Sequence, residues 1–189
     1  MPVNSWAGME DCLSSIVECE PTTVLVTSSE SGLWGCLLRQ YLDIDFGRIQ
    51  PEEWQTRIDA VEPDPARVQP YARRYYTEIV IGDLREVLPR RAAEVRYDVI
   101  LLGDVIEDLY KDDGRALLEA AARLVGRRLV VRIHLADDWV TADEGSEHHL
   151  SHWYAKDFID RTFAGKTCRL REYDLDSGPY AMVTFNSSG

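Results

Sequence analysis

Residues 24–35 read VLVTSSESGLWG, and this stretch decides how the chain folds. Its first three residues are aliphatic, which predicts a short buried strand. From Leu33 onward, apolar residues recur at helical spacing through Trp34, Leu37, Leu38 and Tyr41, which predicts a helix. The small residues between them place backbone N–H groups at a helix N-terminus, where open parallel sheets bind nucleotide-like ligands. We therefore expect a ligand at residues 27–32.

The length and the charge of the chain limit its class and its partners. Its 189 residues suit one domain with a full hydrophobic core. The net charge of −12 argues against attraction to nucleic-acid phosphates or to anionic lipid. We therefore expect a small-molecule substrate and neither a nucleic-acid nor a membrane partner, while a homodimer stays open.

Cysteine usage and apolar runs indicate the compartment. The four cysteines show neither a CxxC pair nor a Cys/His metal spacing, so we expect free thiols and no metal site. Residues 1–8 lack the basic and apolar parts of a signal peptide, and no apolar run approaches the ~20 residues of a membrane span. These features predict a cytoplasmic protein.

The rest of the chain alternates between apolar runs and helical patterns. We predict a leader helix within residues 1–21 and a main domain over residues 22–186, in which residues 43–57 form an insertion. Further helices are expected at residues 67–76, 85–94, 114–125 and 151–163. Further strands are expected near residues 58–62, 78–81, 97–102, 128–135, 166–175 and 179–185.

This alternation predicts the topology of the sheet. Five apolar strands separated by helices imply a parallel, doubly wound sheet with right-handed crossovers. The last two strands, joined by Asp176, Ser177 and Gly178, form an antiparallel hairpin. The predicted fold class is α/β, with a Rossmann-like, mostly parallel seven-stranded sheet that ends in an antiparallel pair.

The residues at the predicted strand ends carry a family resemblance. They are the first loop at 27–32, Glu62, Gly82 with Asp83, and the segment GDVIE at 103–107. From about residue 22 to the C-terminus, the chain resembles the class I S-adenosylmethionine-dependent methyltransferases. The stretches at 32–35, 56–59, 97–107 and 147–153 resemble, more narrowly, small stand-alone bacterial methyltransferases with mostly undefined substrates. The resemblance implies S-adenosylmethionine as the cofactor and a methyltransferase-like main domain.

The first loop departs from the pattern of that superfamily. Where the pattern reads acid-x-Gly-x-Gly-x-Gly, this chain has Val26, Ser28, Glu30 and Gly32, so that only the last glycine is kept. A non-glycine residue at positive φ costs roughly 1–2 kcal/mol. Glu30 adds a negative charge, which would either face the cofactor carboxylate or pair with its amino or sulfonium group. We expect Ser28, Glu30 and Gly32 to hold the methionyl half of the cofactor weakly.

Three later acids match the resemblance better. It places Glu62 on the ribose hydroxyls, Asp83 with the Leu84 backbone on the adenine, and Asp104 beside the position of methyl transfer. From the residues alone, Glu62 can equally cap the turn at residues 63–65, and Asp83 can cap the helix that follows it. Asp104 and Glu107 can likewise cap or line the approach to the next helix.

The catalytic candidates come from two segments. We expect Glu107 to act in the site, although Asp108 stands where the resembling proteins commonly have a histidine. The segment at 137–153 holds three of the four histidines, and its Glu147, His149, Ser151 and Trp153 reproduce a Glu-x-His-x-Ser-x-Trp pattern of those proteins.

We interpret the segment at 137–153 as a substrate lid. In it, His149 is the general base and Glu147 orients its imidazole, while Trp139 and Trp153 supply aromatic surface. One alternative is a helix-capping loop with Ser151 as the N-cap. Another is a metal site at His148 and His152, which have no recognised ligand spacing.

The predicted function is S-adenosylmethionine-dependent methyl transfer to an oxygen or nitrogen atom of a small molecule. One alternative is a degenerate member of the fold that does not methylate and catalyses another step on a biosynthetic intermediate. Another is an interaction subunit that supports an active partner.

Overall fold

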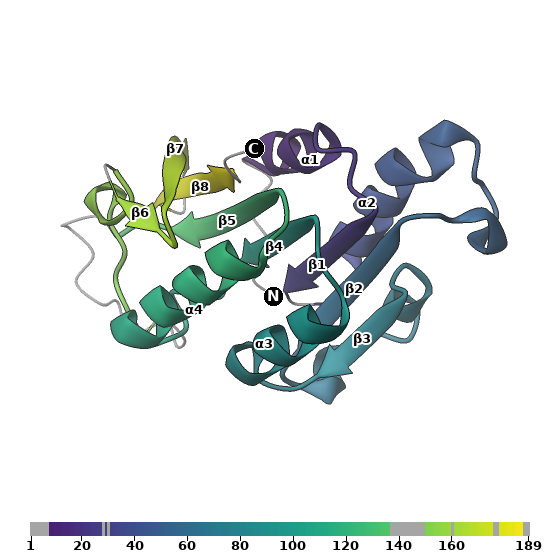
Figure 1. Ribbon diagram of the computed structural model, residues 1–189, viewed down its shortest axis with the longest axis horizontal. Helices are drawn as coiled ribbons and strands as arrows, with labels where there is room; N and C mark the ends of the chain where they lie inside the picture. The colour runs from purple at the N-terminus through teal and green to yellow at the C-terminus, as the bar shows by residue number, and fades with distance from the viewer. Residues whose placement is uncertain are drawn as a thin grey trace.

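Strand β1 (Thr23–Thr27) lies in the middle of the sheet and pairs in parallel on both of its edges (Figure 1). The computed structural model describes residues 8–27, 29, 31–136, 150–159, 161–175 and 178–186. In β1, Val24, Leu25 and Val26 have no exposed surface, because helices cover both faces of the sheet. The predicted buried strand is therefore confirmed.

The sheet has the predicted parallel and antiparallel parts. Within the described ranges its strand order is β3-β2-β1-β4-β5-β8-β7-β6. The parallel strands beside β1 are β2 (Arg57–Glu62), β3 (Glu78–Ile81), β4 (Val99–Gly103) and β5 (Arg128–His134). The antiparallel strands are β8 (Gly178–Asn186), β7 (Lys166–Leu175) and the two-residue β6 (Thr162–Phe163). The fold class is confirmed, and the short β6 adds an eighth strand to the seven predicted.

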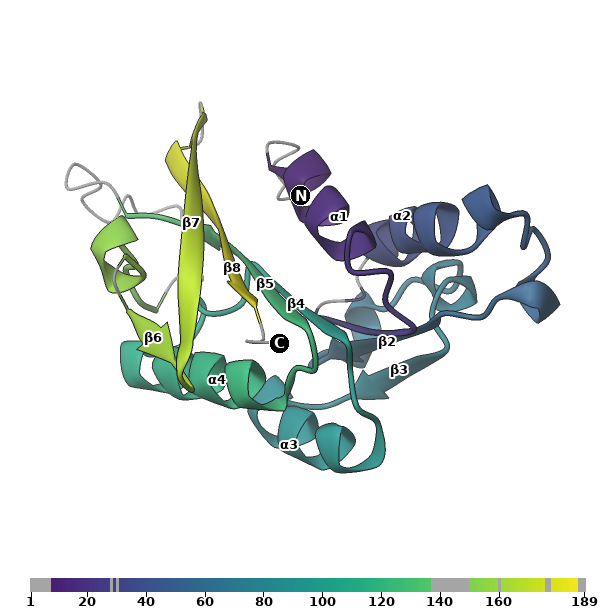
Figure 2. The same cartoon turned by 45° about the horizontal axis from the view of Figure 1, so that its top comes forward.

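Two pairs of helices cover opposite faces of the sheet (Figures 1 and 2). Helices α1 (Met9–Val17) and α2 (Leu33–Leu42) pack on the face that carries Val24 and Val26. Helices α3 (Leu84–Glu94) and α4 (Lys111–Leu124) pack on the face that carries Leu25 and Ile100. In the described part of the chain, no helix combines the length and the apolar character needed to cross a lipid bilayer.

Two predicted helices are wrong. In place of a helix at 67–76, the chain has the end of one short 3-10 turn, η3 (Pro65–Arg67), and a second one, η4 (Ala72–Arg74). Pro70 between them lacks an N–H and disfavours a helical residue before it. Residues 151–163 contain only η5 (Ala155–Asp157), and Tyr154 before it is extended with φ −126° and ψ 155°.

The insertion at residues 43–57 is held by one buried carboxylate. Asp43 has no exposed surface and accepts hydrogen bonds from Arg39 Nη1 (2.8 Å), Arg48 Nε (2.9 Å) and the Gln55 N–H (2.9 Å). Because these donors lie before, within and at the end of the insertion, the carboxylate ties η1 (Ile44–Phe46) and η2 (Pro51–Glu53) back to α2 and β2.

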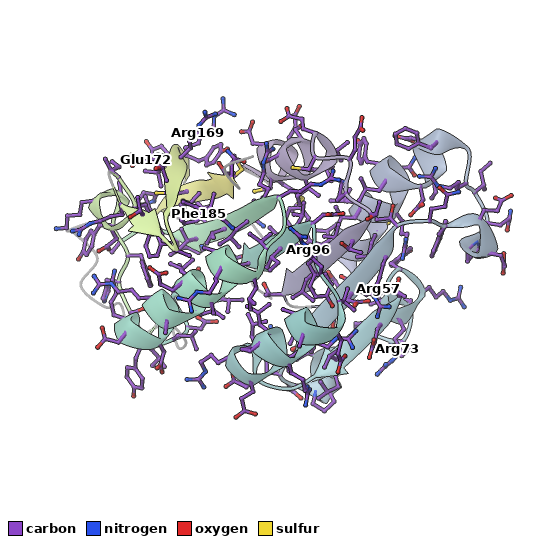
Figure 3. All side chains as sticks on the ribbon, in the orientation of Figure 1. Arg57, Arg73, Arg96, Arg169, Glu172 and Phe185 are labelled. Carbon is purple, nitrogen blue, oxygen red and sulfur yellow. The ribbon has the colours of Figure 1, made fainter. Side chains whose placement is uncertain are left out.

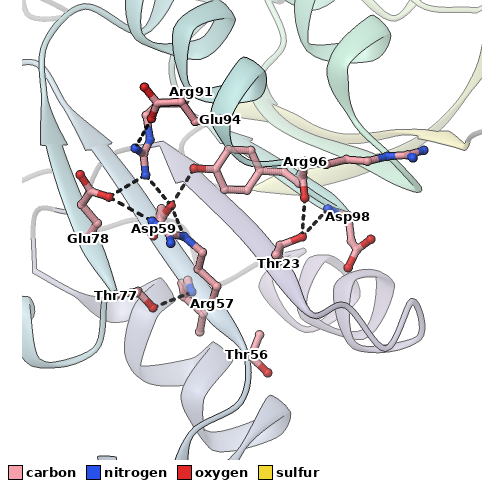
Figure 4. Close-up of polar contacts among 12 residues, drawn as sticks. Thr23, Thr56, Arg57, Asp59, Thr77, Glu78, Arg91, Glu94, Arg96 and Asp98 are labelled. Atoms are coloured by element: carbon pink, nitrogen blue, oxygen red, sulfur yellow. Dashed lines mark hydrogen bonds and ion pairs between the residues drawn. The ribbon is translucent and has the colours of Figure 1, made fainter.

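A second buried carboxylate joins the strands to α3 (Figure 4). Asp59 of β2 has no exposed surface, and its Oδ2 accepts hydrogen bonds from Tyr97 Oη (2.7 Å), Arg57 Nε (2.8 Å) and Arg91 Nη2 (3.1 Å). Arg91 also bonds Glu78 of β3 at 2.6 Å. Two arginines thus balance the charge of Asp59 inside the frame of the fold.

We expect Tyr97→Phe to lower the free energy of unfolding by about 1–3 kcal/mol, because it removes a donor from a buried carboxylate. The measurement is urea denaturation at pH 7. The matched control is Glu94→Gln, which removes an exposed i,i+3 partner of the same Arg91 and should change stability by less than about 0.5 kcal/mol. Equal midpoints for Tyr97→Phe and the wild type would contradict this role.

Candidate functional site

A cavity of about 220 Å³ opens at the carboxyl ends of the central parallel strands. It lies where the strand order turns from β2-β1 to β4, the position at which open α/β sheets bind ligands. Its walls come from the loops after β1, β2, β3 and β4. The lining residues are Thr27, Ser29, Ser31, Leu33, Trp34, Val61, Glu62, Pro63, Arg67, Asp83, Leu84, Arg85, Gly103, Asp104, Val105, Asp108 and Leu109.

Thr27 lies where β1 and β4 separate at the cavity. Their register runs from Val24 to Val26 of β1, where Val26 lies opposite Leu101. One residue later, Thr27 Oγ1 donates a hydrogen bond to the Leu101 carbonyl (3.2 Å) and accepts one from the Gly103 N–H (2.9 Å). The side chain thus satisfies backbone groups that the separating strands would leave unpaired.

The first loop reaches the cavity through its serines. Ser29 and Ser31 line the cavity, whereas Ser28 and Glu30 lie outside the described residues. Gly32 has φ +73° and caps α2, and a Cβ there would come within 2.7 Å of the Ala72 Cβ in η4. Gly32 therefore serves the backbone turn and its packing on η4, and the adjoining cavity wall belongs to its neighbours.

Glu62 joins the end of β2 to the first loop. It has no exposed surface, and its Oε2 accepts hydrogen bonds from the N–H (3.1 Å) and the Oγ (3.4 Å) of Ser29. Its Oε1 accepts one from the Asp64 N–H at 3.4 Å, so the turn-capping interpretation also holds. Burial raises the pKa of Glu62 despite these donors. Glu62 lines the cavity and also fixes the loop beside it, while its contact with a ribose stays a prediction.

Asp83 caps α3 and lines the cavity at the same time. Its Oδ1 accepts hydrogen bonds from the Arg85 N–H (2.8 Å) and from Arg85 Nε (3.0 Å). The Arg85 guanidinium lowers the pKa of Asp83 and also bonds Asp113 at 2.9 Å. The capping interpretation is therefore confirmed, and Asp83 and Leu84 both lie on the cavity wall.

Asp104 follows β4 in a strained conformation. Its φ of +52° is uncommon for a residue with a side chain, and such strain gathers at functional sites. Its Oδ2 lies 3.8 Å from Arg132 Nη1, while its buried Oδ1 has no hydrogen-bond partner in the part of the chain that the structure describes. Burial raises the pKa of Asp104 to about 6.

Glu107 is enclosed behind Asp104. Its side chain is almost fully buried, and its Oε1 accepts a hydrogen bond from the His134 N–H at 3.3 Å. Its Oε2 has no partner among the described residues. Burial, with the charge of Asp104, raises the pKa of Glu107 to about 8, so the carboxyl is protonated at neutral pH. Glu107 does not line the cavity but backs the loop that does.

The capping alternative for Asp104 and Glu107 is wrong. Helix α4 begins at Lys111, and its N-cap residue Tyr110 makes no side-chain capping hydrogen bond. Both acids lie in the loop between β4 and α4, so the other half of that alternative, in which they line the approach to the helix, is confirmed.

The described end of the expected lid is a structural anchor. Ser151 Oγ donates to the Ile106 carbonyl (3.3 Å) and accepts a hydrogen bond from Trp153 Nε1 (2.9 Å). Trp153 is 1% exposed and stacks on Phe158, with Lys111 Nζ over its ring. The prediction that Trp153 is part of the lid surface is therefore wrong, because its side chain is buried in the core. The alternative that Ser151 is an N-cap is also wrong, because its side chain bonds Ile106 and Trp153 and the next helical turn, η5, does not start directly after it.

The remaining lid predictions lie outside the described residues. These are Glu147 and His149, the neighbouring His148, and Trp139. Among the residues that the structure describes, no group of three or more His, Cys, Asp or Glu side chains forms a metal-type cluster.

Sequence reasoning missed two arginines at the site. Arg67 lines the cavity after β2, and Arg132 of β5 lies beneath Asp104 with only 1% of its surface exposed. The signal for Arg132 was present, because a charged residue interrupts an apolar run that reads as a strand covered on both faces. The signal for Arg67 was hidden by the incorrect helix at residues 67–76.

Comparisons with known proteins identify the fold. No family model and no curated protein matches the sequence. An O-methyltransferase family protein from Burkholderia thailandensis is 19% identical, over 96% of this chain and 56% of its own, with a TM-score of 0.63. An O-methyltransferase from Bacillus cereus in complex with S-adenosylhomocysteine is 11% identical, over 98% of this chain and 84% of its own, with a TM-score of 0.67.

A third similar structure is magnesium protoporphyrin IX methyltransferase from Synechocystis with bound S-adenosylmethionine. It is 12% identical, over 96% of this chain and 80% of its own, with a TM-score of 0.62. The chain spans 56% of the length of the Burkholderia protein. The chain has the class I S-adenosylmethionine-dependent methyltransferase fold, as the resemblance predicted.

The buried Glu107 should make stability depend on pH. An unfolded chain loses this proton near pH 4.5, whereas the folded chain keeps it to about pH 8. The folded state therefore binds more protons between these values, and the contribution of Glu107 to stability falls as pH rises through this range. We expect Glu107→Gln, which stays neutral, to exceed the wild type in unfolding free energy by about 1 kcal/mol or more at pH 8, with little difference near pH 5.

The measurement is urea denaturation from about pH 5 to about pH 9. Glu172→Gln is the control, since Glu172 lies exposed on β7 (Figure 3) and its substitution should leave the pH dependence unchanged. Parallel pH curves for the wild type and Glu107→Gln would contradict a raised pKa at this position.

Proposed function

We propose that this protein transfers a methyl group from S-adenosylmethionine to an oxygen or nitrogen atom of a small molecule. The observation that carries the proposal is the pair Glu62, the last residue of β2, and Asp83, in the turn after β3, which line the same cavity. In this role Glu62 accepts hydrogen bonds from the ribose hydroxyls, and Asp83 with the Leu84 backbone contacts the adenine.

The charges of the cavity fit a cationic ligand. Four acids line it, namely Glu62, Asp83, Asp104 and Asp108, against the two arginines Arg67 and Arg85. The charge of Arg85 is balanced by its ion pairs with Asp83 and Asp113. When bound, S-adenosylmethionine supplies an electrophilic methyl group on a positively charged sulfur. An acid-lined, partly enclosed cavity stabilises such a charge more than bulk water does.

The residues of the chain that line the cavity would position the ligand and exclude water from it. Part of the cavity wall is apolar. The side chains that form it are Leu33, Trp34, Val61, Leu84, Val105 and Leu109. Methyl transfer depends mainly on in-line positioning, to which such walls contribute. Glu107, whose side chain is protonated, lies in the loop after β4, and its backbone carbonyl accepts hydrogen bonds from the N–H groups of Leu150 and Ser151.

The altered first loop supports weaker cofactor binding. It keeps Gly32 of the glycine pattern, and this glycine packs against η4. This feature also favours the alternative of a member of the fold that binds another ligand without methylating. Binding of the cofactor product separates these two functions directly.

We expect S-adenosylhomocysteine to bind the wild type and to bind Glu62→Gln at least about tenfold more weakly, because the variant loses a charged acceptor. Isothermal titration calorimetry measures both affinities. Asp113→Asn is the control, since it removes an exposed partner of Arg85 outside the cavity, and its affinity should stay within about twofold of the wild type.

Two outcomes of this titration would count against the proposal. If the wild type shows neither heat nor thermal stabilisation at millimolar ligand, the alternative without methylation replaces it. If Glu62→Gln binds as tightly as the wild type, the ribose contact is wrong.

We further propose His149 as the general base, with Glu147 as its orienting partner, on the strength of the sequence pattern. His149→Ala should lower turnover by roughly 100-fold or more while leaving S-adenosylhomocysteine binding intact. Turnover is measured as release of S-adenosylhomocysteine with an acceptor found by screening phenols, carboxylic acids and amines. His148→Ala is the control and should have a much smaller effect. Equal, mild losses in both variants would reject a role for His149 in catalysis.

A further inference from the structure

Arg132 is a charged residue in a place that ordinarily holds an apolar one. It lies in β5, pairs with Gly103 of β4 and Met182 of β8, and is 1% exposed. Its guanidinium carbon lies 5.5 Å from the centre of the Trp34 ring and 5.1 Å from that of Tyr180. Burying a charge in such surroundings costs free energy unless the charge is paired or hydrogen-bonded. Replacement of a buried ion pair by apolar residues is often neutral or stabilising, so stability alone does not explain an arginine here.

The group that Arg132 faces is Asp104. The two residues are joined through the backbone, where the Asp104 N–H donates to the Arg132 carbonyl at 3.1 Å. Arg132 Nη1 lies 3.8 Å from Asp104 Oδ2, close enough for attraction between the charges but beyond a hydrogen bond. Asp104 itself lines the cavity, with 31% of its side chain exposed. Its left-handed φ of +52° sets the direction of this side chain.

We propose that Arg132 is a positioning residue that keeps the Asp104 carboxylate ionised and presented to the cavity. Arg132 does this from behind the cavity wall, because it does not itself line the cavity. The identification of the cavity's cation as the sulfonium of S-adenosylmethionine rests on the proposed function. The pairing of Arg132 with Asp104 does not depend on the proposed function.

The surrounding charges show why this support is needed. The pKa of Asp104 is raised to about 6 as the net result of three causes: burial raises it most, Arg132 lowers it, and the nearby Asp108 raises it. On the other sides, Glu107 is protonated at neutral pH, and burial raises the pKa of the Cys12 thiol of α1 to about 12. The rings of Trp34 and Tyr180 pack near the Arg132 guanidinium. Loss of Arg132 should therefore let Asp104 take up a proton near neutral pH.

The first test measures Asp104 directly. Protein labelled with ¹³C at the aspartate side-chain carboxyls is titrated by NMR from about pH 4 to about pH 9, and Asp104→Asn assigns the signal. We expect a wild-type midpoint near 6, a midpoint about two pH units or more higher in Arg132→Met, and a value close to wild type in Arg132→Lys. Arg169→Met changes an exposed arginine of β7 and should leave the midpoint unchanged (Figure 3).

The second test compares a cationic with an uncharged sulfur. At pH 7, Arg132→Met should bind S-adenosylmethionine at least about tenfold more weakly than the wild type, and the difference should shrink at pH 9 as Asp104 ionises. Its affinity for S-adenosylhomocysteine, which lacks the sulfonium, should change less than about threefold. Arg132→Lys keeps the charge and should restore most of the selectivity, which a merely structural role would not predict.

The outcomes separate this proposal from the function proposed above. Equal midpoints in the wild type and Arg132→Met overturn the proposal, whatever the protein binds. A raised midpoint in a protein that binds neither ligand supports the action of Arg132 on Asp104 and rejects the methyltransferase function. A raised midpoint with equal losses for both ligands overturns presentation of the carboxylate to the sulfonium. If Arg132→Met does not fold, Arg132→Gln provides the neutral variant for both tests.

Discussion

The parallel pairing of β1 with β2 on one edge and with β4 on the other is the constraint on which the rest of the structure depends. Val26 lies opposite Ala60 in one ladder and opposite Leu101 in the other. Parallel strands need long crossovers, and the right-handed rule sends the crossovers to opposite faces when the chain turns back at β1. The carboxyl ends of β1, β2 and β4 therefore meet beneath one cavity. Glu62 and Asp104 both line it, although they are 42 residues apart in the sequence.

The buried acids of this protein divide into two physical types. Asp59 has two arginines and a tyrosine on one oxygen, and Asp43 has two arginines and backbone donors, so both stabilise the frame. Asp59, Asp104 and Glu107 each keep a buried oxygen that lacks a partner among the described residues, but only Asp59 accepts hydrogen bonds from two arginines on its other oxygen. Such an oxygen costs about 1–3 kcal/mol, a cost that proteins tolerate mainly at functional sites. The loop after β4 therefore differs from the frame in that its two buried acids accept no hydrogen bond from an arginine among the described contacts.

The framework followed from the sequence because its signals are local. Apolar runs at 24–26, 78–81 and 128–135 predicted strands, and their alternation with helices predicted the topology. The helix predicted at 151–163 was wrong because the conformation of this segment depends on a residue distant in sequence. The Ile106 carbonyl accepts hydrogen bonds from Ser151 and Trp153 and holds the chain in a non-helical conformation. At the site, strand-end positions indicated Glu62 and Asp83. No local pattern could show that Asp83 would share its carboxylate with Arg85, or that Arg132 would face Asp104, because those contacts arise only when the strands are assembled.

The anchor at Trp153 also has a consequence for how related sequences can diverge. The Ala136 N–H bonds the Trp153 carbonyl at 2.7 Å, and the Glu107 carbonyl accepts from the N–H groups of Leu150 and Ser151 at 2.8 and 3.0 Å. The chain between residues 136 and 150 thus starts and finishes at two fixed points beside the loop that carries Asp104. Because the entropy of closing a loop rises only slowly with its length, insertions and deletions between these points cost the fold little. Related sequences can therefore differ in the length of this segment while the sheet, the buried acids and the cavity stay the same.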